Sequence, residues 1–219
     1  MLLPIKENEI NKLIPAVATG DQFNAALGNP QKIFQRIMVS AIGGVITLLI
    51  SQSQITSQFY SLWLVLGVVF LLYILWGPIL EASRKNFKFK NYSFSALVDG
   101  YISDVYVEDR VEKKQEQANK NGRLEIIEKK KTWVVLEIED EDGYIGNICF
   151  PLQNKFNILK KGMKINCVVF SNRKDFNNIQ AISDAWCPEI NLWVGYYPFL
   201  LRPAFEEFIN RRILNLLSK

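Results

Sequence analysis

Residues 33–80 read IFQRIMVSAIGGVITLLISQSQITSQFYSLWLVLGVVFLLYILWGPIL, and this stretch decides the fold. From Ile37 to Leu80 it contains no Asp, Glu, Lys or Arg, a gap of 44 residues in a chain that is 22% charged. A helix needs about 20 residues to cross the hydrocarbon core of a bilayer. The stretch therefore predicts a transmembrane helical hairpin, with spans at about 33–53 and 59–80. A buried pair of helices in a soluble protein is the alternative, but the second segment has no polar face.

Aromatic side chains mark both ends of the second predicted span. Phe59, Tyr60 and Trp63 begin it, and Tyr73 and Trp76 come near its end. Aromatic residues are enriched at both membrane–water interfaces, so this spacing supports a membrane span.

Small residues mark the first predicted span, and a breaker follows the second. Ser40, Gly43 and Gly44 are spaced so that a second helix can approach closely, although ordinary membrane glycine usage explains them equally well. Gly77-Pro78 is expected to end the second helix.

The flanking charges predict the orientation. Lys32 and Arg36 precede the first span, and the connecting turn is uncharged. A basic juxtamembrane linker, residues 81–92, follows the second span and contains Arg84, Lys85, Lys88 and Lys90. Basic flanks stay on the cytoplasmic side, so both termini are expected there. The same four side chains are candidate contacts for anionic lipid headgroups.

Residues 1–32 are expected to form a cytoplasmic N-terminal tail with one or two short helices. Asp21 is a plausible N-cap for the segment QFNAAL, and Gly28-Asn29-Pro30 is a strong stop signal.

Residues 93–188 predict a small antiparallel β-barrel of the OB or SH3-like kind, with a β-sandwich as the alternative. Val134, Leu136 and Ile138 alternate with other residues before an Asp142-Gly143 hairpin turn. A strand broken at Gly100 and a loop over 113–123 are expected earlier in this domain. The overall fold class is thus an α+β membrane protein.

The acidic runs in this domain do not predict a metal site. Glu139, Asp140, Glu141 and Asp142 are consecutive, so their carboxylates should diverge around a solvated turn instead of converging on one ion.

Residues 189–219 predict an aromatic segment followed by a C-terminal amphipathic helix. Candidate contacts with a partner or a membrane, including one residue at the end of the barrel domain, are Trp186, Trp193, Tyr196, Tyr197, Phe199, Phe205 and Phe208. The helix begins after Pro203, and it either closes the barrel or lies on a membrane or in a partner's groove.

Composition argues against several functional classes. The chain has no histidine, which removes the commonest general base and metal ligand. Its three cysteines form no CxxC pair, and no Gly-rich phosphate loop is present. Residues 91–219 carry 18 basic and 18 acidic side chains, a balance that argues against nucleic-acid binding. We therefore expect no catalytic residue, no cofactor and no metal.

Three segments carry a resemblance to a known family. LEIEDEDGYIGNICFP, SDAWCPEINLWVGYYPFLLRPAFEE and LWGPILEASRKN are similar to a family of poorly characterised two-span membrane proteins of cyanobacteria and plastids. Some members carry the label "phosphate ABC transporter permease", although two predicted spans are fewer than such a permease needs. The resemblance implies a photosynthetic setting, in a thylakoid or plasma membrane.

These patterns predict a membrane-anchored, non-enzymatic adaptor. The expected partners are the lipid bilayer and another membrane protein complex, which the resemblance implies is photosynthetic. The alternative is an accessory subunit of a membrane transporter.

Overall fold

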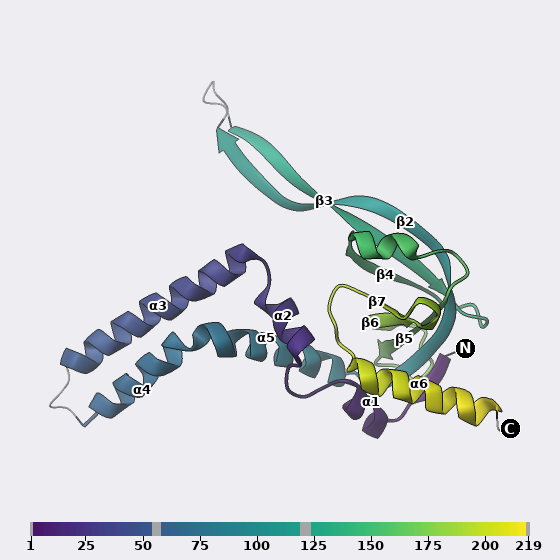
Figure 1. Ribbon diagram of the computed structural model, residues 1–219, viewed down its shortest axis with the longest axis horizontal. Helices are drawn as coiled ribbons and strands as arrows, with labels where there is room; N and C mark the ends of the chain where they lie inside the picture. The colour runs from purple at the N-terminus through teal and green to yellow at the C-terminus, as the bar shows by residue number, and fades with distance from the viewer. Residues whose placement is uncertain (1, 54–57, 119–123, 218–219) are drawn as a thin grey trace. The chain divides into compact units, whose positions relative to one another are not determined.

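The computed structural model describes residues 2–53, 58–118 and 124–217. The chain divides into two compact units, residues 1–10 with 92–200, and residues 11–91 with 201–219. The first unit is a sheet and the second is helical, which confirms the α+β class (Figure 1).

A curled antiparallel sheet makes up the first unit. Its order in the described residues is β4-β3-β2-β5-β6-β7, and β1 pairs with β2 beyond the end of β3. The strands are β1 (Leu2–Ile5), β2 (Phe94–Ala118), β3 (Leu124–Glu139), β4 (Ile145–Pro151), β5 (Lys164–Ser171), β6 (Ile179–Cys187) and β7 (Leu192–Val194). The sheet curls into a half-barrel, in which β4 and β6 do not pair with each other, so the predicted small barrel has the half-open form.

The core of this unit fills the concave side of the curl. Val134, Leu136 and Ile138 are buried, as their alternation predicted, and they pack with Phe150 and Ile165 from other strands. Burying each such side chain contributes about 1.5–3 kcal/mol.

Strand β2 is longer than the sequence indicated. The predicted break at Gly100 is wrong: this glycine lies within the strand, where an added Cβ would come 2.5 Å from the Glu139 carbonyl oxygen. The glycine therefore permits a close approach of two strands. The predicted loop over 113–123 is also wrong as far as residue 118, because β2 pairs with β3 out to Ala118 and Leu124, and residues 119–123 lie outside the described residues. Strand β4 pairs with β3 only from Glu139 back to Trp133. Between Trp133 and Leu124, β3 pairs with β2 alone, so these two strands form a two-stranded ribbon (Figure 1).

The turn between β3 and β4 confirms the Asp142-Gly143 hairpin. Gly143 has φ +83°, a conformation that glycine adopts without steric cost. Asp140 is only 5% exposed, and its Oδ1 accepts hydrogen bonds from the backbone N–H of Asp142 at 2.9 Å and of Tyr144 at 2.8 Å. The expectation of a wholly solvated acidic turn is therefore wrong for Asp140, which is part of the turn's internal structure.

Helices make up most of the second unit. Helix α1 (Glu7–Leu13) leads into it, and α2 (Gly20–Leu27), α3 (Pro30–Ser53), α4 (Tyr60–Leu71), α5 (Tyr73–Lys90) and α6 (Arg202–Leu217) follow. Thr19, not Asp21, is the N-cap of α2, because its Oγ1 accepts the backbone N–H of Gln22. Gly28, at φ +81°, ends α2 as predicted.

The predicted second span, residues 59–80, is not one straight helix. Helix α4 ends at Leu71, and α5 begins at Tyr73 after a bend of 72°. Gly77 and Pro78 lie buried inside α5, so the expected helix end there is wrong. The helix continues through the segment expected to be a linker, as far as Lys90.

Side chains donate hydrogen bonds to backbone carbonyl groups near this bend. In a regular α-helix the Leu75 N–H would donate to the Leu71 carbonyl, four residues back, but here it donates to the Leu72 carbonyl. Ser40 Oγ donates to the Leu71 carbonyl at 2.5 Å, and Trp76 Nε1 donates to the Val69 carbonyl at 2.8 Å. Neighbouring polar groups thus satisfy carbonyls that the helix leaves open.

In the described part of the chain, one helix, α3, is long and apolar enough to cross a membrane. A second span exists only if the bent pair α4 and α5 is counted as one. The two-span hairpin therefore stays a prediction.

Candidate functional site

The open seam of the half-barrel forms a groove of about 940 Å³ in the first unit. This is near the upper end of the range for ligand sites, roughly 300–1,000 Å³. Its walls are the outer edge of β4, at Ile145–Cys149, and the first half of β6, at Ile179–Asp184.

The edge of β4 presents backbone groups to this groove. Asp140 N–H donates to the Tyr144 carbonyl at 3.1 Å, and Leu152 N–H donates to the Thr132 carbonyl at 3.0 Å. Because bonded and non-bonded pairs alternate in an antiparallel ladder, Ile145, Asn147 and Cys149 direct their N–H and C=O groups away from β3. These outward groups can pair with an additional strand.

The opposite wall, β6, is irregular. Its pairing with β5 shifts register between Cys167 and Val169, where Ser183 Oγ accepts the Val168 N–H at 3.0 Å in place of a backbone carbonyl. Strand β7 covers β6 only at Ala185–Cys187, so within the described residues Ile179–Ser183 has no strand on its groove side. Bulges of this kind are frequent at sheet edges and next to functional sites.

Asp184 closes one end of the groove. It is 4% exposed, and its Oδ1 accepts the backbone N–H groups of Phe199 and Leu200, both at 3.0 Å. Gly195, at φ +151°, lies so close to Asp184 that an added Cβ would be 2.9 Å from the aspartate Cβ. These contacts hold residues 195–200 against the end of β6.

Aromatic rings line this closed end. Tyr196 is 69% exposed and stacks on Trp133 with ring centroids 5.6 Å apart. Arg110 lies over the other ring of this pair, 5.5 Å from the centroid of Trp133, and its guanidinium also donates to Cys149 Sγ at 3.3 Å. Tyr197 is buried and packs on Phe199, with centroids 4.7 Å apart.

Carboxylates mark the other end. Neighbouring strands are antiparallel throughout, so β4 and β6 run in the same direction and the turns that precede them lie at the same end. Those turns contribute two exposed groups, Asp142 and Asp175. No Lys or Arg lines the groove among the residues that the structure describes, so its lining is acidic.

One phenol and two thiols beside the core, those of Tyr144, Cys167 and Cys187, are neutral near pH 7. Burial raises the pKa of the Tyr144 phenol, with further contributions from Cys167 and Asp140. Burial likewise raises the pKa of the Cys167 thiol, and it raises that of Cys187 to about 12 with a contribution from Glu189. Neither buried thiol is a nucleophile near neutral pH, since the thiolate is the reactive form. In the described ranges no group of three or more Cys, Asp or Glu side chains could hold a metal ion.

The predicted aromatic set divides between several places. Tyr196, Tyr197 and Phe199 line the groove, while Trp186 and Trp193 stack on each other, with centroids 6.4 Å apart, outside it. The other two aromatics, Phe205 and Phe208, lie in α6.

Helix α6 and the residue before it contact other parts of the second unit. Phe205 is fully buried, and Arg212 lies 4.9 Å from the ring centroid of Phe208. Leu201 N–H donates to the Leu13 carbonyl, and Arg202 pairs with Asp21 at 3.1 Å.

A basic hollow in the second unit contains most of the predicted headgroup contacts. It measures about 400 Å³ and is lined by Arg36, Arg84, Lys85 and Lys88 together with Glu81. Lys90 is not in its lining.

Glu81, which the sequence analysis did not single out, holds this cluster together. It accepts Arg36 at 2.6 Å and Lys85 at 2.9 Å, and Lys32 lies 3.9 Å away. Arg36 is only 8% exposed and also donates to the Leu27 carbonyl, so it joins α3 to α2 as well as to α5.

The predicted packing residues lie between α3 and α4. Ser40 and Gly44 are buried, and an added Cβ on Gly44 would be 2.5 Å from Leu71 Cδ2. An added Cβ on Gly43 would be 2.7 Å from Phe70 Cδ1, and one on Gly67 of α4 would be 2.9 Å from Leu48 Cδ2. Small residues thus sit at the contact on both helices.

A family model, described as a family of unknown function (DUF8619), matches residues 3–214. The chain belongs to this family. No curated protein and no solved structure matches it. The family match covers residues of both units.

Proposed function

We propose that this chain is a membrane-anchored, non-enzymatic adaptor. In this proposal α3 and the bent pair α4 and α5 hold it in a bilayer, and the groove of the half-barrel binds a segment of another membrane protein complex. The observation that carries the proposal is that α3 and α4 bury small or polar residues and expose large apolar side chains.

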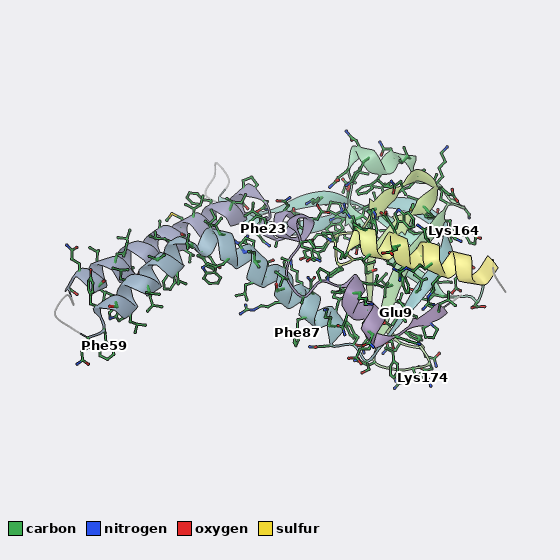
Figure 2. All side chains as sticks on the ribbon, turned by 60° about the horizontal axis from the view of Figure 1, so that its bottom comes forward. Glu9, Phe23, Phe59, Phe87, Lys164 and Lys174 are labelled. Carbon is green, nitrogen blue, oxygen red and sulfur yellow. The ribbon has the colours of Figure 1, made fainter. Side chains whose placement is uncertain are left out.

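The buried side of α3 is small and polar. Its buried residues are Arg36, Ser40, Gly44, Thr47 and Ser51. Nine large apolar side chains of the same helix are more than a third exposed, and Figure 2 shows side chains projecting outward along the helix pair: Phe34, Ile37, Met38, Val39, Ile42, Val45, Ile46, Leu48 and Leu49.

This arrangement is costly in water. Leaving such a side chain fully exposed forgoes about 1.5–3 kcal/mol, so nine that are on average about half exposed amount to roughly 10 kcal/mol. That is as large as the net stability of a typical domain, about 5–15 kcal/mol. A hydrocarbon surrounding removes the cost, which supports a membrane location for the pair.

The polar side chains of α3 satisfy the other requirement of a lipid environment. Ser40 donates to the Leu71 carbonyl, Thr47 to the Gly43 carbonyl at 2.7 Å, and Ser51 to the Tyr60 carbonyl at 3.4 Å. Polar groups in lipid need internal partners, because no water is present to replace them.

The basic hollow around Glu81 supports the orientation. It places Arg84, Lys85 and Lys88 at the end of the apolar region. Basic flanks stay on the cytoplasmic side and attract anionic headgroups, each worth about 1 kcal/mol near the surface. We therefore place both termini in the cytoplasm, and the family resemblance adds a thylakoid or plasma membrane to the proposal.

The membrane part is tested by extraction and by protease protection. We expect the chain to stay with membranes in alkaline carbonate and to float with lipid vesicles. Protease added outside sealed cells should leave the half-barrel intact. Release of the chain into the aqueous fraction without detergent contradicts the anchor, and cleavage from outside contradicts the orientation.

The adaptor part is tested by affinity purification in mild detergent. We expect a membrane complex to copurify with the chain and to be lost in Tyr196→Ala. The matched control is Tyr101→Ala, which removes an exposed tyrosine of β2 that does not line the groove. Equal recovery from both variants contradicts groove binding. Copurification with a permease, together with altered uptake after deletion, identifies a transporter subunit instead.

A further inference from the structure

We propose that the groove accepts an extended, basic peptide segment of the partner, which adds as a strand to the edge of β4. This inference rests on the proposed adaptor function and names the chemistry of its partner.

The shape of the groove fits a strand. Ile145, Asn147 and Cys149 direct backbone N–H and C=O groups into it, and such a row of groups is a template for another strand. The edge of five residues from Ile145 to Cys149 is about 17 Å long, the length of a five-residue extended peptide. Pro151 ends this edge, because it has no N–H to donate.

The topology sets the direction of the guest. Strands β4 and β6 both run parallel to β2, so a strand that is antiparallel to β4 is also antiparallel to β6. Only that direction continues the alternation of the sheet. The guest's N-terminal end then lies at the aromatic end of the groove, and its C-terminal end lies between the turns that precede β4 and β6.

The charges set the guest's composition. Asp142 and Asp175 lie at the end that receives the guest's C-terminal residues, and no basic side chain lines the groove in the described part of the chain. Tyr196 offers an exposed ring at the opposite end. The complementary segment therefore has an aromatic residue first, alternating apolar residues in the middle and Lys or Arg last. An acidic lining also disfavours a nucleic acid guest.

The test uses the purified full chain in detergent and four fluorescein-labelled hexapeptides. The probe is YVTVKR, and the controls are its reverse RKVTVY, the acidic YVTVEE and a backbone N-methylated YVTVKR. We expect YVTVKR to bind at least tenfold more tightly than each control. Because charge contributes, Asp142→Asn with Asp175→Asn should weaken binding roughly tenfold at low salt and much less at high salt. Equal binding of the reversed peptide overturns the direction, and equal binding of the N-methylated peptide overturns strand addition.

One variant isolates the β4 edge. Asn147→Pro removes an N–H that points into the groove and takes no part in the β3–β4 ladder, so we expect it to abolish YVTVKR binding. Asn147→Ala keeps that N–H and should bind normally. Both variants should show the thermal unfolding of the unchanged chain, and peptide binding that survives Asn147→Pro overturns the proposal.

The same variant separates this inference from the proposed function. If the partner complex copurifies with Asn147→Pro, the adaptor function stands and strand addition is overturned. If YVTVKR binds as expected but no complex copurifies, strand addition stands and the adaptor function fails. If the chain self-associates through the groove and Asn147→Pro dissociates it, the guest is a second copy of the chain, which overturns a partner peptide.

Discussion

Asp184 offers a quantitative test of how the groove is built. Its carboxylate accepts the N–H groups of Phe199 and Leu200, and all three residues are largely removed from water. A hydrogen bond to a charged group contributes about 1.5–3 kcal/mol, so Asp184→Ala should lower the free energy of unfolding by about 3–6 kcal/mol. Asp184→Asn keeps an oxygen acceptor without the charge and should lose about half of that.

Thermal unfolding of the full chain in detergent measures this effect. Trp186 and Trp193 lie in β6 and β7, so their fluorescence reports on this unit. A loss of 1 kcal/mol lowers the Tm of a domain by a few degrees, so Asp184→Ala should lower it by on the order of 10–20 °C. Glu141→Ala, an exposed carboxylate in the β3–β4 turn, is the control and should change the Tm little.

Two results would refute the reasoning. If Asp184→Ala and Glu141→Ala shift the Tm equally, the two backbone hydrogen bonds do not stabilise residues 195–200. If Asp184→Asn is as damaging as Asp184→Ala, the retained oxygen does not replace the carboxylate, and the acceptor geometry is not what matters.

Three further predictions concern other parts of the chain. Iodoacetamide at pH 8 should label the half-buried Cys149 much faster than Cys187, because a pKa of about 12 keeps the Cys187 thiol protonated. The labelling rate of Cys187 should rise toward pH 12 or on unfolding in urea. Equal labelling rates of the two thiols at pH 8 count against the burial of Cys187. Gly44→Leu should separate α3 from α4, seen as lost cross-linking between cysteines placed on the two helices, whereas an unchanged yield argues against their close contact. Gly100→Val should destabilise the half-barrel by about 1–3 kcal/mol in urea unfolding, since its Cβ meets the Glu139 carbonyl, and a neutral effect contradicts that packing.

Only part of the candidate site was predictable. The aromatic residues of 196–199 were recognised from composition, and three of the seven predicted aromatics line the groove. No sequence pattern distinguishes Asp184 or Asn147. An aspartate that accepts two backbone N–H groups looks the same in the sequence as a surface aspartate. Their roles depend on which strands lie beside them.

The sequence by itself determined the features that local pattern controls. The long run without charge predicts apolar helices, alternation predicts buried Val134, Leu136 and Ile138, and Asp142-Gly143 predicts a hairpin turn, because each depends on residues within a few positions of one another.

Tertiary structure decided the rest. The bend at Leu72 and the approach of Arg36 and Lys32 to Glu81 involve side chains supplied by another helix, α3. The groove depends on how far the sheet curls, which leaves β4 and β6 without a shared ladder. The register and curvature of the whole sheet determine which strand edges face each other across the seam. Neither property produces a periodic pattern in the sequence.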